Sequence, residues 1–250
     1  MPRGNRYYLS GYVWPITHRC HKREFLLKFA RDRRRWLQRL GEAKKRFGVI
    51  IRDDKGEEVI PQTMQLIAGR TGQEYNQRKN RKGAFGEDRY QATAVEAESH
   101  LSRCMVYIDL NRVRAGVVTH PSEWPFCGFG EIQNPRQRYS LIDYEGLMDL
   151  FGIRSMEEFK GVHRGWVTEA LEKQGWRKRQ PQWTESIAVG GEGFVRETKE
   201  RLGAKAMWRE VVGENGTYEL RESLTSYEDD FGPKNVGLRF KKAFYWDISF

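Results

Sequence analysis

The stretch VYIDLNRVRAG (residues 106–116) combines helical spacing with an unusual concentration of polar side chains. In a helix, Tyr107 and Asn111 are one turn apart and share a face, with Arg112 and Arg114 beside them. Two guanidinium groups lower the cost of forming a phenolate and also bind phosphate, so these side chains suit attack on a phosphodiester. On spacing alone, Tyr107 is equally well an ordinary core aromatic residue.

Around this stretch the sequence predicts alternating helices and short strands, which is typical of a mixed α/β (α+β) fold. Pro61 suits the first turn of a helix, and Ser155 with Glu158 has the spacing of a capping box. Residues 214–217, Glu-Asn-Gly-Thr, predict a hairpin turn. We expect helices over residues 25–47, 61–75, 97–116, 143–151, 156–173 and 192–202, and strands over residues 12–16, 49–52 and 90–95.

The charge distribution favours nucleic acid as a partner. The chain of 250 residues has 44 Lys+Arg against 34 Asp+Glu, a formal net charge of +10. Residues 1–120 hold 25 Lys+Arg and 13 Asp+Glu, whereas the remainder holds 19 and 21. Arginine supplies 29 of the 44 basic residues, and its planar guanidinium suits phosphate binding and base stacking. A surface that is basic only for solubility is the alternative.

Several classes of protein are excluded. No run approaches the roughly 18 apolar residues that span a bilayer, and residues 1–9 are polar where a signal peptide needs an apolar segment. We therefore expect a cytoplasmic protein with no membrane partner. The three cysteines form no C-x-x-C pair, which argues against a disulfide framework or a cysteine-built zinc site. His18, Cys20 and His21 form a single cluster without a distant partner pair, which is more typical of a structural or surface group than of a metal site.

Several motifs, in order, resemble the REP-associated tyrosine transposases, single-strand transposases of the HUH nuclease superfamily. Residues 107–117 are similar to the family's Y-I-x-x-N-x-V-R-A-G-V signature, and Gly83 to Phe85 with the Arg89–Tyr90 pair resembles its basic, glycine-rich loop. The similarity covers about residues 1–130. Residues 140–250 resemble, less closely, a C-terminal helical extension of one branch of the family.

The resemblance implies a ferredoxin-like antiparallel sheet with helices on one face in residues 1–130, followed by a mostly helical extension in residues 140–250. It implies that Tyr107 attacks single-stranded DNA beside a hairpin and forms a 5′-phosphotyrosine, and that Asn111 assists a divalent ion, Mg²⁺ or Mn²⁺. Unpaired bases would stack on Phe85 or Tyr90. The residues expected to contact DNA are Arg81, Lys82, Phe85, Arg89, Tyr90, Arg112 and Arg114.

One departure from the family pattern bears on the chemistry. The family carries a His-x-His metal pair on a strand after the first long helix, but here residues 47–49 run almost directly into the turn at residues 53–56. The five histidines, His18, His21, His100, His120 and His163, include no pair two residues apart. Loss of the metal removes a Lewis acid worth several kcal/mol of transition-state stabilisation. We expect no metal bound in the family manner, since the acidic turn Asp53, Asp54 and Glu57 is more typical of a solvated loop.

The sequence therefore predicts a transposase-family protein that binds single-stranded or hairpin DNA, with DNA transposition as its ancestral role and strand cleavage impaired. DNA binding is expected to survive because its electrostatic part depends on the basic surface and not on a metal. One alternative is a non-catalytic regulator that binds DNA or RNA hairpins, and another is a chain that does not fold stably. The family includes monomers and dimers, so a homodimer stays open.

Overall fold

The computed structural model describes residues 9–18, 20, 26–47, 59–86, 90–138, 140–214 and 216–222. Helices predominate and the strands are short, which confirms the predicted mixed α/β class. The helices are α1 (Ala30–Phe47), α2 (Val59–Arg78), α3 (Ser99–Asp109), α4 (Asn111–Arg114), α5 (Gly128–Gln133), α6 (Tyr144–Asp149), α7 (Met156–Lys173), α8 (Gln182–Glu185) and α9 (Glu192–Leu202), with 3-10 turns η2 (Pro121–Glu123), η3 (Gly175–Arg177) and η4 (Gly203–Ala206). The strands are β1 (Ile16–Thr17), β2 (Gln91–Ala92), β3 (Ala94–Val95), β4 (Ala188–Gly190), β5 (Arg209–Glu214) and β6 (Thr217–Glu222).

The strands form two small sheets. β1 pairs antiparallel with β2, and single bridges from Val13 to Val95 and from Cys20 to Gly86 extend that pairing. The second sheet has the order β3-β4-β6-β5, in which β3 runs parallel to β4 and the other neighbours are antiparallel. The sheet is therefore mixed, whereas a wholly antiparallel sheet was expected. The parallel pair arises because β4, from a distant part of the chain, runs in the same direction as β3.

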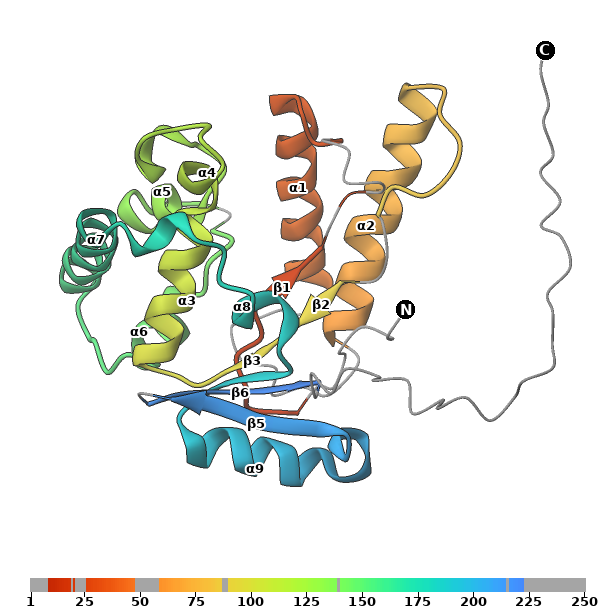
Figure 1. Cartoon of the computed structure of the whole chain (residues 1–250). Helices are drawn as coiled ribbons and strands as arrows, with labels where there is room; N and C mark the ends of the chain where they lie inside the picture. The colour runs from red at the N-terminus through yellow and green to blue at the C-terminus, as the bar shows by residue number, and fades with distance from the viewer. Residues whose placement is uncertain are drawn as a thin grey trace, which may run out of the picture.

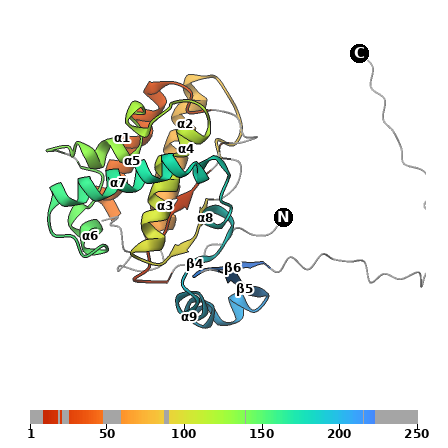
Figure 2. The same cartoon turned by 60° about the vertical axis from the view of Figure 1, so that its left-hand side comes forward.

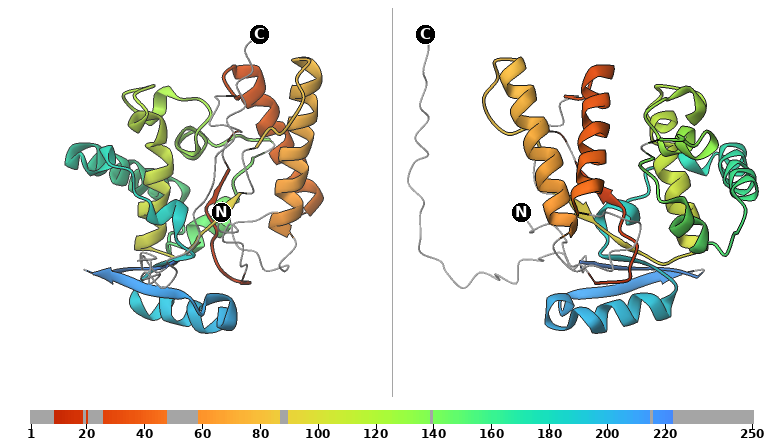
Figure 3. Two further views of the ribbon diagram at one scale, coloured as in Figure 1. Left: turned by 45° about the vertical axis from the view of Figure 1, so that its right-hand side comes forward. Right: turned by 180° about the vertical axis from the view of Figure 1, so that it is seen from behind.

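Helices cover both sides of this sheet, where the sequence predicted one side. Figures 1 and 3 show α9 on one side of β5 and β6, and α1, α2 and α3 on the other. β4, α9, β5 and β6 follow one another along the chain, so this additional layer is built by residues 188–222. The segment expected to be mostly helical thus supplies three of the strands.

The hydrophobic core joins the two segments that the sequence separated. Tyr12, Trp14 and Met64 lie in one buried cluster with Ile187 and Leu220. The buried hydroxyl of Thr93 also donates to the carbonyl of Ser186 at 2.8 Å. Strand pairing and core packing therefore both run between residues 1–130 and residues 140–250.

Most predicted helices are confirmed, and their ends follow the expected signals. The hydroxyl of Ser155 caps α7, whose bounds match the prediction, and α9 matches as well. The hairpin at residues 214–217 is also confirmed: Glu214 pairs with Thr217, and Gly216 has a φ of 78° that suits glycine. The predicted strand at residues 49–52 and the turn after it lie outside the described residues.

The helix predicted over residues 97–116 is interrupted. Leu110 leaves helical geometry with a ψ of 2°, which separates α3 from α4. α7 crosses α3 in the view of Figure 2, and the two helices pack together. Within the described ranges, no helix is both long enough and apolar enough to span a membrane.

Candidate nucleic-acid interface

Tyr107 lines a cationic pocket of about 460 Å³ between α3 and α7. Among the described lining residues, Arg103, Arg114 and Lys173 are cationic and Glu169 is the sole carboxylate. The Glu169 carboxylate pairs with the Lys173 ammonium. Two guanidinium groups therefore remain to balance an incoming anion, so the pocket suits a phosphate group.

The Tyr107 and Arg114 side chains lie against each other. The guanidinium carbon of Arg114 lies 4.0 Å from the centroid of the Tyr107 ring, a cation–π contact between two half-buried residues. Burial lowers the pKa of the Arg114 guanidinium, and the neighbouring Tyr107 opposes that change. A guanidinium stays charged at neutral pH, so Arg114 brings a full positive charge to the phenol.

The Tyr107 hydroxyl is open to the pocket. Its oxygen has no hydrogen-bond partner in the part of the chain that the structure describes, and this oxygen is accessible and not buried. An accessible phenol beside a fixed cation is the arrangement that a tyrosine nucleophile needs.

Asn111 does not join this pocket. It is exposed at the start of α4 and is not among the described residues that line the pocket with Tyr107. The prediction that Tyr107 and Asn111 share a face assumed one continuous helix, and the break at Leu110 removes that premise. The break could not be predicted, because the sequence has no helix-breaking residue at or beside Leu110.

Arg112 lies against a different neighbour from Arg114. Its guanidinium carbon is 5.0 Å from the ring centroid of Trp124, and that of Arg33 in α1 is 4.4 Å from the same ring. Burial, together with the charge of Arg33, lowers the pKa of Arg112. Arg33 is also 5.3 Å from the Phe126 ring. These two arginines and two aromatic rings link α1 to the η2 region, and sequence reasoning did not identify Arg33 as a partner.

The predicted basic loop contributes less than expected. Arg81 supports its own loop, donating to the Asn76 side chain at 3.2 Å and to the Ala84 carbonyl at 2.9 Å. Lys82 is exposed. Phe85 and Tyr90 are only 7% and 8% exposed, so their rings belong to the core and are not surfaces on which bases stack. Arg89 lies outside the described residues.

The described histidines have structural partners. His100 lies 3.1 Å from the Glu96 carboxylate, His120 caps η2, and the buried His163 lies 3.0 Å from Asp109. His18 lies near the ring of Trp36. In the described ranges, no three His, Cys, Asp or Glu residues gather as metal ligands.

The described residues around Tyr107 therefore do not fit the expected Mg²⁺ or Mn²⁺ site, because they provide one carboxylate, Glu169, and no histidine. His21 and the acidic turn of Asp53, Asp54 and Glu57 lie outside the described residues.

No protein-family model, curated protein or solved structure matches this chain. Of the predicted site residues, the structure brings Tyr107 and Arg114 together and places Arg112 against Trp124. It leaves Asn111 and Lys82 exposed and outside the described lining of the pocket around Tyr107.

Proposed function

We propose that the protein binds single-stranded or hairpin DNA as the transposases it resembles do, and that strand cleavage by Tyr107 is impaired. The observation that carries the proposal is the open phenol of Tyr107 beneath the Arg114 guanidinium in a cationic pocket. The proposal does not extend to the family's ferredoxin-like sheet, because the four-stranded sheet is mixed and has helices on both sides (Figure 1). DNA transposition is the ancestral process in which such a site acts.

Binding follows from charge and from the rings beside it. Arg103 and Arg114 face the pocket without a carboxylate partner in the described region, and Arg33 and Arg112 contact the Trp124 ring. Guanidinium groups near aromatic rings bind phosphates and stacked bases of single strands. This electrostatic attraction needs no metal.

We infer that strand cleavage is impaired from the groups that the pocket provides to stabilise the transition state. Arg103 and Arg114 attract a phosphodiester before the reaction as well as during it, and uniform binding of this kind does not accelerate chemistry. The family's metal would add stabilisation that grows as charge develops on the phosphate. The described residues around Tyr107 supply no ligand set for that role.

The test uses the full chain and a labelled DNA hairpin with single-stranded extensions, in Mg²⁺ and in Mn²⁺. We expect salt-sensitive binding without a covalent protein–DNA adduct, and Tyr107→Phe should bind as well as the wild type. An adduct that forms with the wild type and disappears in Tyr107→Phe would show that cleavage is intact.

An RNA hairpin of the same sequence is the comparison ligand. Tighter binding of DNA supports the transposase type of protein. Equal affinity for DNA and RNA would instead favour a non-catalytic hairpin-binding regulator, because the protein would then ignore the 2′-hydroxyl.

A further inference from the structure

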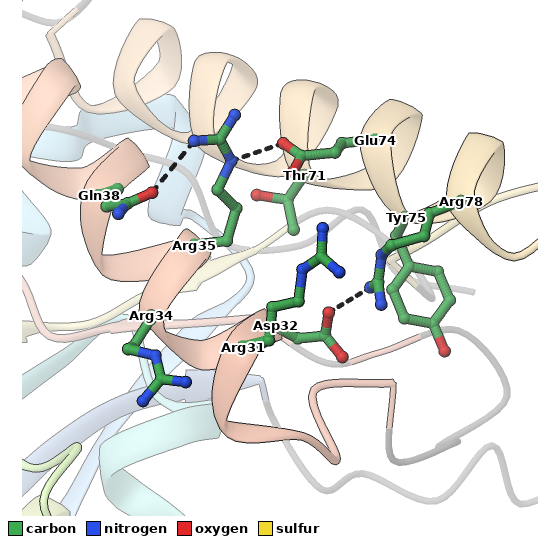
Figure 4. A pocket seen from close by; sticks show the side chains of 9 residues that line it. All are labelled: Arg31, Asp32, Arg34, Arg35, Gln38, Thr71, Glu74, Tyr75 and Arg78. Carbon is green, nitrogen blue, oxygen red and sulfur yellow. Dashed lines mark hydrogen bonds and ion pairs between the residues drawn. The ribbon is translucent and has the colours of Figure 1, made fainter.

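The groove between α1 and α2 is a second cationic site, lined by residues other than those around Tyr107. It has a volume of about 410 Å³. Among its described lining residues, four guanidinium groups face two carboxylates, which leaves an excess of two positive charges. The described residues that line it are Arg31, Asp32, Arg34, Arg35 and Gln38 from α1, and Thr71, Glu74, Tyr75 and Arg78 from α2 (Figure 4).

Two of the arginines are held in position by neighbours. Arg35 donates from Nε to Glu74 at 2.7 Å and from Nη1 to Gln38 at 3.0 Å, and Arg78 donates from Nη2 to Asp32. Each guanidinium keeps further N–H groups beyond these bonds. Side chains fixed in this way lose little conformational entropy when they bind an anion.

The other two arginines are exposed. Arg31 and Arg34 have no ion-pair partner among the residues that the structure describes. In Figure 4 the Arg31 side chain extends toward α2, whereas Arg34 points away from it and also lines the hollow beside Phe126. Both residues line the groove, so their positive charges add to those of Arg35 and Arg78 and make a bound anion favourable.

The floor of the groove carries polar atoms without partners. Asp32 and Thr71 are 5% and 4% exposed, and neither the buried Oδ2 of Asp32 nor the buried Oγ1 of Thr71 has a hydrogen-bond partner among the residues that the structure describes. Buried polar atoms are nearly always hydrogen-bonded in folded proteins. The lining also includes the polar side chains of Gln38 and Tyr75, so a ligand that brings both an anion and further polar groups fits this groove better than a bare ion does.

We propose that the α1–α2 groove binds the phosphate and adjoining polar groups of a nucleotide, and that in the DNA complex this nucleotide belongs to the single-stranded segment beside the hairpin. The assignment to DNA rests on the proposed function, whereas the phosphate site does not. Arg33, in the same turn of α1, contacts Trp124, which also contacts Arg112. The arginines of α1 thus continue toward α4, the helix that carries Arg114.

The test compares a blunt DNA hairpin with one that carries a single-stranded extension, each titrated with the full chain over a salt series. The double variant Arg31→Gln/Arg34→Gln should bind the extended hairpin roughly ten-fold more weakly, and its slope of log affinity against log salt should flatten by about 1.4, or about 0.7 for each lost phosphate contact. Binding of the blunt hairpin should change little.

The matched control is Arg154→Gln/Arg196→Gln, which removes the same charge from exposed residues away from α1 and α2. Its effect should be small and equal for both hairpins. If the two double variants affect the extended hairpin equally, the groove is not a phosphate site for DNA and the inference is overturned.

Titration with AMP distinguishes a groove that binds a nucleotide of the DNA from one that binds a free nucleotide. AMP that competes with the extended hairpin, and whose binding weakens in Arg31→Gln/Arg34→Gln, supports the proposal. AMP binding that depends on these arginines but does not compete with DNA would overturn the assignment to DNA and leave a free nucleotide as the ligand. A wild type that binds no hairpin contradicts the proposed function, and the AMP titration alone then decides the phosphate site.

Discussion

At the scale of single residues, Asp109 organises the region that positions Tyr107. Its buried carboxylate accepts a hydrogen bond from the backbone N–H of Phe129 at 2.9 Å and lies 3.0 Å from Nε2 of His163, which is fully buried. One side chain thereby joins α3, α5 and α7. The spacing predicts that Asp109 lies in the same helix as Tyr107. Its partners could not be predicted, because they lie 20 and 54 residues further along the chain.

Replacement of Asp109 should therefore destabilise the fold. We expect Asp109→Ala to lower the free energy of unfolding by about 2–4 kcal/mol, since it leaves Nε2 of His163 and a backbone N–H buried without partners. Asp109→Asn should cost less, because an amide oxygen still accepts from Phe129. Urea denaturation measures both variants, and a change below about 0.5 kcal/mol in Asp109→Ala would show that this group carries little of the stability.

At the scale of elements, helices were predicted more reliably than strands. Caps and apolar spacing lie within a helix's own sequence, so α7 and α9 could be predicted. β4 is three residues long, and its pairing with β3 depends on residues some ninety positions away. Phe85 shows the same limit: its basic neighbours indicated an exposed loop, but its ring packs beside Tyr75, with centroids 5.4 Å apart.

The close contact between α2 and this loop gives a paired prediction. A Cβ added at Gly72 would lie 2.9 Å from the Cβ of Phe85, whereas one added at Gly69 in the same helix meets nothing within 4 Å. Gly72→Ala should therefore destabilise the protein by about 1–3 kcal/mol through overpacking. Gly69→Ala should stabilise it by about 0.5–1 kcal/mol, because alanine favours the helix. Thermal or urea unfolding of the two variants tests this, and stabilisation by both would contradict the packing of Phe85 on α2.

At the scale of the whole molecule, the N-terminal and C-terminal segments depend on each other. The sequence divided the chain into residues 1–130 and residues 140–250, by the extent of the resemblance. In the structure β3 forms hydrogen bonds with β4, and Tyr12 and Trp14 share a buried cluster with Leu220. No local pattern reveals such contacts, because they join residues far apart in sequence.

Truncation tests whether the N-terminal segment can fold without the C-terminal segment. A chain of residues 1–138 loses β4, which pairs with β3, and loses Ile187 and Leu220 from the cluster of Tyr12 and Trp14, so we expect no cooperative thermal transition. A chain of residues 1–222 keeps every described contact, so we expect it to unfold cooperatively, as we also expect of the full chain. Cooperative unfolding of the 1–138 chain would show that the N-terminal segment is an independent domain.

Charge is likewise a property of the whole molecule. Within the described residues before position 120, α1, α2 and α4 carry many of the basic side chains, and Arg33, Arg112 and Arg114 contact aromatic rings. The sequence predicted this partner class from composition, but it could not assign each arginine to its neighbour. These helices would contact several phosphates of a nucleic acid bound across them, so the affinity should depend steeply on salt.

The most direct measurement is the binding of an extended DNA hairpin by the full chain, followed by fluorescence anisotropy across a salt series and by denaturing electrophoresis of the same samples. We predict that log affinity falls linearly with log salt by about 0.7 for each phosphate contacted, that Tyr107→Phe follows the same line, and that no covalent adduct forms. Absence of salt-sensitive binding would contradict DNA recognition, and a Tyr107-dependent adduct would contradict impaired cleavage.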